Sequence, residues 1–162
     1  MDSKITDIVI SDLNDFLKSR HPSSVLQFIT GMMVGWTHFE KKEPSKTEID
    51  LAWKNYFDLL RNSIDGRLSL VSNGSLSNER QKILRFPSQV YEKRKLDEVI
   101  TLLGSMPPDD AMNLIVEVTV SWCFAIPQNY LSFLPDVPQD ESDEAIANTI
   151  YEWLVRYYDL WN

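Results

Sequence analysis

The segment SSVLQFITGMMVGWTHF, residues 23–39, decides the fold of this chain. Wound as a helix it is apolar on more than one side, so we expect it at the centre of a core. Its apolar residues are Val25, Leu26, Phe28, Ile29, Met32, Met33, Val34, Trp36 and Phe39. Ser23 is expected to cap its N-terminus. His21-Pro22 ends the preceding helix, because a residue before proline avoids the helical region.

Apolar residues recur at helical spacing along most of the chain. The pattern predicts helices over about residues 5–19, 23–39, 45–64, 77–86, 88–103, 108–125 and 140–161. Ser45 and Glu48 form a capping box at the start of the third helix, and Asp65-Gly66 is expected to stop it. Ser88 can cap the fifth helix, and Gly104 is expected to end it in a left-handed conformation.

Two segments lack this periodicity. Residues 67–78, RLSLVSNGSLSN, contain the turn signal Asn73-Gly74 and are predicted as a loop, with a short β-ribbon near 67–76 as the alternative. Residues 127–139 hold three prolines and are expected to be ordered and largely extended. The sequence therefore predicts an all-α fold: one helical domain over residues 1–162, built as a bundle or irregular array of six to seven helices.

Composition restricts the class of protein. The single cysteine, Cys123, lies in an apolar run and is expected to be a buried hydrophobe in a reducing compartment. Aspartates interrupt the N-terminal segment, so no signal peptide is expected, and no apolar stretch is long enough to cross a bilayer. We expect a cytoplasmic protein without membrane contact. A pI near 4.7 argues against direct binding to nucleic acid.

No residue pattern indicates catalysis. The two histidines, His21 and His38, have no partner at metal-ligand spacing and are expected to be surface or capping residues. Cys123 has only apolar neighbours, whereas a nucleophile needs an adjacent base. The adjacent acids Asp109 and Asp110 are explained by the helix dipole, which favours anions in a first turn. We therefore expect a protein that is not an enzyme and uses no metal or cofactor.

Charge is distributed very unevenly. Residues 96–162 carry twelve acids and one base, Arg156, whereas residues 80–95 carry six bases and one acid. The basic segment is a small nucleic-acid patch, an intramolecular partner of the acidic half or a solvated helix. The densest acidic run has no base, and we expect it to steer a cationic partner, with helix-start stabilisation and solubility as the alternatives. Its members are Asp136, Asp140, Glu141, Asp143 and Glu144.

The last helix carries a second signal for a partner. Its expected inward residues are Ile146, Ile150, Trp153, Leu154, Tyr157 and Trp161. At helical spacing, Tyr151, Val155 and Tyr158 then fall on another side. Aromatic anchors beside charges are typical of interface hot spots, so Tyr151 and Tyr158 are candidate anchors. The alternative is that another helix of this chain covers this side.

In size, acidity, helical content and lack of catalytic groups, the chain resembles the small acidic immunity proteins of bacterial toxin systems, including contact-dependent and secreted nuclease toxins. The resemblance covers the whole chain and involves no motif, so it assigns no residue. It implies one-to-one binding of a basic toxin domain. The leading hypothesis is thus a non-enzymatic inhibitor of a basic protein partner, monomeric alone and heterodimeric with that partner. The alternatives are a self-associating helical adaptor or regulator, and a metal-dependent helical hydrolase that uses Asp109 and Asp110.

Overall fold

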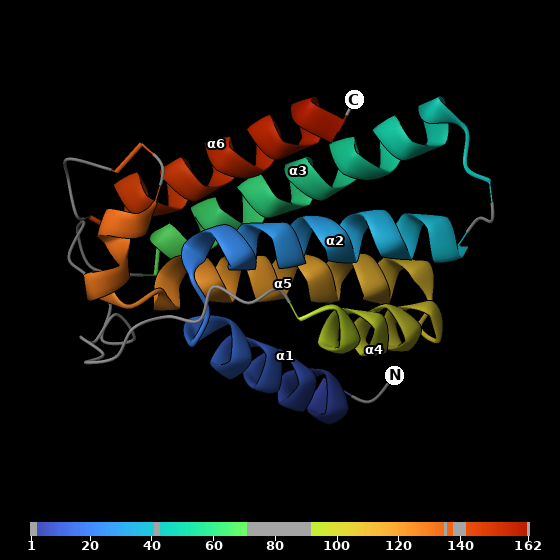
Figure 1. Ribbon diagram of the computed structural model, residues 1–162, viewed down its shortest axis with the longest axis horizontal. Coiled ribbons are helices and arrows are strands. Elements are labelled where there is room, and N and C mark those ends of the chain that lie inside the picture. Colours follow the sequence, from blue (N-terminus) through green and yellow to red (C-terminus); the bar gives the residue numbers. More distant parts are fainter. Residues whose placement is uncertain (1–2, 41–42, 71–91, 135, 138–141, 162) are drawn as a thin grey trace.

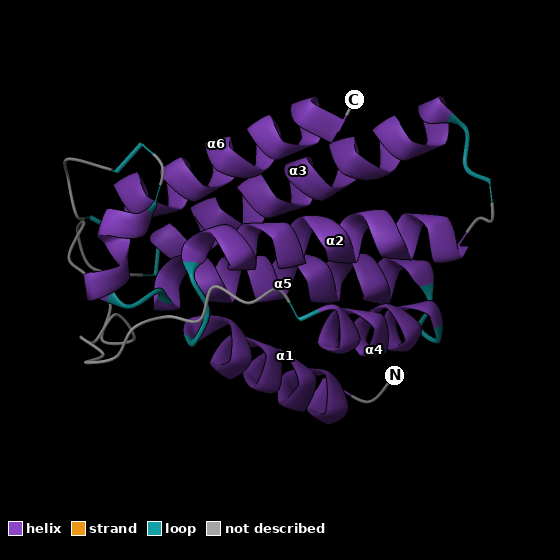
Figure 2. Cartoon of the chain, in the orientation of Figure 1, coloured by secondary structure: helices purple, strands orange, loops and turns teal. Residues whose placement is uncertain are grey.

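The computed structural model describes residues 3–40, 43–70, 92–134, 136–137 and 142–161, and within them the chain is all-α (Figure 1). Figure 2 shows helices joined by loops, without a strand in the described part of the chain. The elements are α1 (Ser3–Lys18), α2 (Pro22–Glu40), α3 (Lys46–Leu68), α4 (Lys93–Gly104), α5 (Pro108–Ala125), the 3₁₀-helix η1 (Gln128–Phe133) and α6 (Asp143–Trp161). The predicted all-α class is confirmed.

Two helices form the centre of the array. α5 packs against all five other α-helices, and α2 packs against α3, α4, α5, α6 and η1. Nearly every residue of α5 between Ala111 and Ala125 is buried; its exposed or half-exposed positions are Asn113, Glu117 and Ser121. The central position expected for residues 23–39 is thus confirmed, and α5 shares it, because a helix that is apolar on several sides needs neighbours on several sides.

The start of α2 differs from the prediction. The helix begins at Pro22, and His21 rather than Ser23 occupies the capping position. The His21 Nδ1 atom accepts a hydrogen bond from the Ser23 backbone N–H at 3.2 Å, and it lies 2.8 Å from the Ser23 hydroxyl. Pro22 suits the first helical position, because it has no N–H to leave unsatisfied there. The expectation of a capping histidine is therefore confirmed for His21.

The capping box of α3 is confirmed, but its predicted end is wrong. The Glu48 N–H donates to the Ser45 hydroxyl at 3.2 Å, and the Ser45 N–H donates to the Glu48 carboxylate at 3.3 Å. At the other end, the helix passes through Gly66 and ends at Leu68. One glycine costs a helix only about 1 kcal/mol, which the packing of this long helix outweighs.

The segment after α3 lies mostly outside the described residues. Arg67 and Leu68, the first two residues of the alternative β-ribbon, are helical, while 71–76 and the predicted helix 77–86 cannot be compared. α4 begins at Lys93, five residues after Ser88, and Glu92 is its N-cap. Ser88 itself lies outside the described part. The predicted cap at Ser88 is therefore wrong for this helix.

Gly104 ends α4 for a reason other than the predicted left-handed conformation. It is the last helical residue, and Ser105 after it is right-handed. A Cβ at Gly104 would lie 2.0 Å from Cε1 of Phe39, so the absence of a side chain admits the Phe39 ring. Gly35 on α2 does the same for α4, because a Cβ there would lie 2.2 Å from Cδ1 of Ile100. Glycine thus allows close approach of α2 and α4 at two points.

The connection from α5 to α6 is less extended than predicted. η1 forms after Pro127, whose carbonyl accepts a 2.9 Å hydrogen bond from the Tyr130 N–H. Tyr130 is buried, and the Phe133 ring lies 4.9 Å from the imidazole of His21. The prolines exclude an α-helix here, but one i to i+3 turn needs few donors, so the 3₁₀ form is compatible with them.

The last helix largely follows its predicted pattern. α6 starts at Asp143, and the Ser142 hydroxyl accepts from the Ala145 N–H at 3.2 Å, as expected for a cap. Of the residues expected to face inward, Ile146, Ile150 and Leu154 are completely buried, and Trp153 and Tyr157 are half-buried. The Trp161 side chain lies outside the described residues.

Candidate functional site

The acidic run is only partly a surface feature. Asp143 has no exposed surface, so its predicted role in steering a partner is wrong. The reason is its position: Asp143 precedes Ile146 by three residues and Ile150 by seven, which places it on the buried side of α6. Glu144 is exposed, and its steering role stays a prediction. Asp140 and Glu141 lie outside the described residues.

Asp136 is exposed and forms an ion pair with Arg156, the one base of residues 96–162. Its backbone has φ 55°, a left-handed conformation that aspartate tolerates better than most residues. Exposed pairs of this kind contribute little to stability. The pairing nevertheless offsets the negative charge of Asp136, which leaves Glu144 as the stronger steering candidate of the two.

The aromatic side of α6 has neighbours within the chain. The Tyr158 ring centroid lies 5.1 Å from that of Trp53 on α3, and the Tyr158 hydroxyl donates to the Asp50 carboxylate. The centroid of the Tyr151 ring lies 6.0 Å from that of Phe57, which, like Trp53, belongs to α3. α3 thus covers this side of α6, which was the alternative to exposed anchors. Both tyrosines remain half-exposed, and their role in partner binding stays a prediction.

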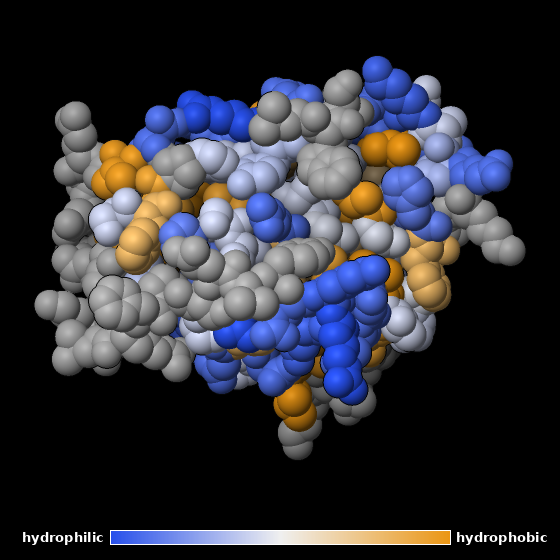
Figure 3. Space-filling model, viewed as in Figure 1, coloured by the Kyte–Doolittle hydropathy of each residue, from blue (hydrophilic) through white to orange (hydrophobic). Residues whose placement is uncertain are grey.

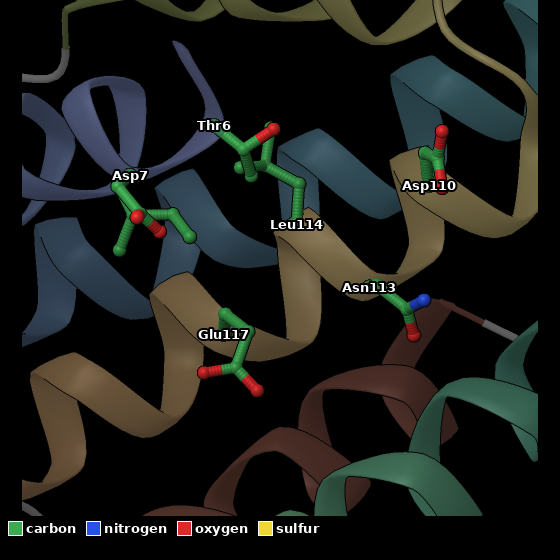
Figure 4. Close-up of a pocket in the computed structure, with 7 residues that line it drawn as sticks. Thr6, Asp7, Asp110, Asn113, Leu114 and Glu117 are labelled. Atoms are coloured by element: carbon green, nitrogen blue, oxygen red, sulfur yellow. The ribbon is translucent and has the colours of Figure 1, made fainter. Parts of the chain in front are cut away.

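A cavity of about 230 Å³ between α1 and α5 is lined by three carboxylates (Figure 4). Asp7 comes from α1, and Asp110 and Glu117 come from α5; Thr6 and Asn113 add polar groups. None of the lining residues that the structure describes is basic. Three like charges on one concave surface produce a negative potential that low-dielectric walls concentrate. This cavity is therefore the strongest candidate for a contact with a cation.

The local sequence explains how α5 presents these acids. Asp110 lies in the first turn, where the helix dipole stabilises an anion. Glu117 is the only charged residue of the buried helix after that turn, and it lies seven residues further on the same side. This spacing marks a polar stripe in the sequence. Only the tertiary packing of α1 on α5, however, places Asp7 beside it.

The three carboxylates do not suit a single metal ion. Figure 4 shows the Asp110 and Glu117 side chains pointing in different directions. Seven residues of helix separate these two along α5 by about 10 Å. Among the described residues, no group of three or more His, Cys, Asp or Glu side chains is arranged to hold a metal ion. Two cationic side chains, each with its charge at one end, match this spacing better than one ion.

The basic segment before residue 96 is engaged within the chain at two described positions. Lys95 donates to Asp12 of α1 at 2.9 Å, and Arg94 lies 3.8 Å from Glu98. Figure 3 shows the resulting gathering of hydrophilic side chains over α4 and the neighbouring part of α1. Asp12 lies outside the acidic residues 96–162, and Glu98 lies one turn away from the exposed Arg94 on the same helix, so pairing of the basic segment with the acidic half stays a prediction. Residues 80–91 lie outside the described part.

Cys123 and His38, which were considered for chemistry from the sequence, each have a place in the packing of the helices. Cys123 is completely buried, as predicted. The His38 Nδ1 atom lies 2.8 Å from the Val34 carbonyl oxygen of its own helix. None of the helices in the described residues combines the length and apolar character needed to cross a membrane. Comparison with protein-family models, with curated protein sequences and with solved structures gives no match.

Proposed function

We propose that this chain is a non-enzymatic binding protein that neutralises a basic protein partner. In its most specific form, the proposal is a cytoplasmic immunity protein that inhibits a cognate bacterial toxin by one-to-one binding. The observation that carries the proposal is the cavity between α1 and α5, where Asp7, Asp110 and Glu117 lie together and no described lining residue is basic. A basic side chain of the partner would enter this cavity, lose its hydration water and gain contacts with the carboxylates.

The electrostatics of the whole chain support the same reading. A net charge of −8 attracts a basic protein from a distance and raises the rate of encounter. Glu144, exposed at the start of α6, adds to this long-range attraction. The contacts inside the cavity would act on dissociation, because a charge pair that loses its water is difficult to separate. Association should therefore slow steeply with salt, over a Debye length of about 8 Å at physiological ionic strength.

The test begins with affinity capture from the source lysate, followed by binding kinetics with the captured protein. The cavity variant carries Asp7→Asn, Asp110→Asn and Glu117→Gln, which preserve shape and remove three charges. We expect a basic protein to be captured in one-to-one ratio. Its dissociation constant should rise at least about tenfold for the cavity variant, equivalent to a loss of about 1.4 kcal/mol.

A matched control separates the cavity from net charge. Asp15→Asn, Asp58→Asn and Glu152→Gln change the charge of three exposed acids on α1, α3 and α6 by the same amount. This control should change the dissociation constant less than about threefold. An equal loss in both variants would remove the cavity from the proposal. Capture of no basic protein, or a stable homodimer in light scattering of the pure chain, would favour the self-associating adaptor instead.

A further inference from the structure

A second cavity, of about 450 Å³, lies among α2, α4 and α6. In Figure 1, α2 runs between α4 and α6, and these three helices supply all of the described lining. Its main lining residues are Gln27, Val34 and Gly35 of α2, Leu96 and Ile100 of α4, and Tyr157 of α6. Its described lining residues all differ from those of the acidic cavity between α1 and α5.

Glycine shapes the α2 wall of this second cavity. Gly31 and Gly35 are one helical turn apart and both belong to the lining. At Gly35 the missing side chain admits Ile100, whose Cδ1 atom would lie 2.2 Å from an added Cβ. Ile100 therefore lies close against α2 and forms the cavity wall from α4. The space itself is within the range of about 300–1,000 Å³ that is typical of small-molecule sites.

The polar groups in the lining are few and differ in availability. The Thr30 hydroxyl donates to the Leu26 carbonyl at 2.8 Å and is therefore engaged. The Tyr157 hydroxyl has no hydrogen-bond partner among the described residues, although its ring packs against that of Trp153 at 5.2 Å. The hydroxyl carries its proton at neutral pH and can donate it, and burial raises the pKa of Tyr157 further. The exposed side chain of Gln27 adds an amide at the rim.

The lining selects against charge. None of the described lining residues is acidic or basic. A charged ligand would lose water there without gaining a counter-charge, which is strongly unfavourable. An apolar body gains from burial against Val34, Leu96 and Ile100, whereas a hydrogen-bond acceptor can face the Tyr157 hydroxyl. Mostly apolar walls with one or two available polar groups are the common composition of ligand sites.

We propose that this cavity binds an uncharged, mainly apolar small molecule that accepts a hydrogen bond from the Tyr157 hydroxyl. The site is independent of the proposed binding of a basic partner, because it uses other residues. The ligand proposed for this cavity is uncharged, whereas the partner proposed for the acidic cavity is basic. Occupation would tie α6 to α2 and α4, and would thereby stabilise the chain in proportion to ligand concentration.

The probe for the test is prodan, 6-propionyl-2-(dimethylamino)naphthalene, which is uncharged, fluorescent and carries a ketone acceptor. Titration into the full chain should give saturable emission with a shift to shorter wavelength, because the dye leaves water. Val34→Phe fills the cavity and should weaken binding at least about tenfold, the loss expected when ligand and side chain compete for space. Leu51→Phe, which enlarges an apolar residue that is 61% exposed on α3, should leave binding unchanged.

Tyr157→Phe keeps the ring and removes only the donor, so it guards against a Val34→Phe variant that fails to fold. It should weaken prodan binding about threefold to tenfold, the value of one hydrogen bond. The anionic naphthalene dye 8-anilinonaphthalene-1-sulfonate should bind more weakly than prodan. The proposal is overturned if prodan shows no saturable binding, if Tyr157→Phe and Leu51→Phe behave alike, or if the anionic dye binds more tightly.

Discussion

The hydrogen bond between Tyr56 and Thr119 gives a sharp prediction about the core. Both side chains are completely buried, and their hydroxyl oxygens lie 2.9 Å apart. The Thr119 hydroxyl donates to the Ile115 carbonyl at 2.8 Å, so its only proton is used. Tyr56 must therefore be the donor and Thr119 the acceptor. This asymmetry predicts unequal costs for removing the two partners.

Removal of the donor should cost less than removal of the acceptor. Tyr56→Phe leaves Thr119 with its bond to Ile115 and loses one net hydrogen bond, about 1 kcal/mol. Thr119→Val is nearly isosteric but leaves the Tyr56 hydroxyl buried without an acceptor, which costs about 2 kcal/mol. In the double variant neither group is left unsatisfied, so it should lose about 1 kcal/mol or less rather than the 3 kcal/mol that additivity predicts.

Urea unfolding at 25 °C with a common slope measures these free energies of unfolding. For a chain of this length, about 2 kcal/mol corresponds to a fall in Tm of about 4–8 °C. The reasoning would be refuted if Thr119→Val cost no more than Tyr56→Phe, or if the double variant lost as much as the two single variants together.

The same pair predicts a dependence on alkaline pH. Burial raises the pKa of Tyr56 above its ordinary value of about 10. Above pH 10 the unfolded chain therefore gives up this proton while the folded chain keeps it, so stability falls as pH rises. The loss assigned to Tyr56 should reach about 1.4 kcal/mol at pH 11. Between pH 8 and 11 the free energy of unfolding of the natural chain relative to Tyr56→Phe should fall by this amount, which turns an advantage of about 1 kcal/mol into a small deficit. A constant difference would contradict the assignment.

Three further substitutions test the helices, each measured by urea unfolding. Gly66→Ala should raise the free energy of unfolding by about 0.5–1 kcal/mol, because an added Cβ meets no atom within 4 Å inside α3. Gly35→Ala should lower it by about 1–3 kcal/mol through the clash with Ile100, and a gain there would contradict the close packing of α2 on α4. Ser45→Ala should lower the free energy of unfolding by about 1 kcal/mol, because the Glu48 N–H loses its acceptor. No loss would mean that the capping box does not contribute to stability.

The sequence predicted those features that depend on local spacing. The helices over 23–39 and 108–125 follow from apolar residues on several sides, and the capping box of α3 follows from Ser45 and Glu48. Gly66 does not stop α3 because the packing of the long helix outweighs its low helix propensity, whereas Gly104 shows that glycine has two uses. A left-handed turn is a local property, whereas room for the Phe39 ring is a property of two helices that are distant in sequence.

The candidate site was less predictable for the same reason. The spacing of Asp143 to Ile146 and Ile150 already indicated a buried position, but the density of acids in that segment favoured a surface interpretation. The stripe of Asp110 and Glu117 on α5 could be read from the sequence. Its completion by Asp7 could not, because 103 residues separate Asp7 from Asp110 and no local rule relates them.

The central position of α5 has a consequence for the order of events during protein synthesis. α1 buries Leu13 and Leu17 and packs mainly against α5, yet Ala125 at the end of α5 follows Lys18 by 107 residues. At about 5–20 residues per second, the ribosome makes α1 roughly 5–20 s before its docking surface is complete. During that interval α2 can offer a partner to Phe16 through Phe28, but the surface of α5 that α1 mainly packs against does not yet exist. The chain should therefore engage chaperones that bind emerging apolar segments, and ribosome-bound chains halted before residue 108 should keep that contact.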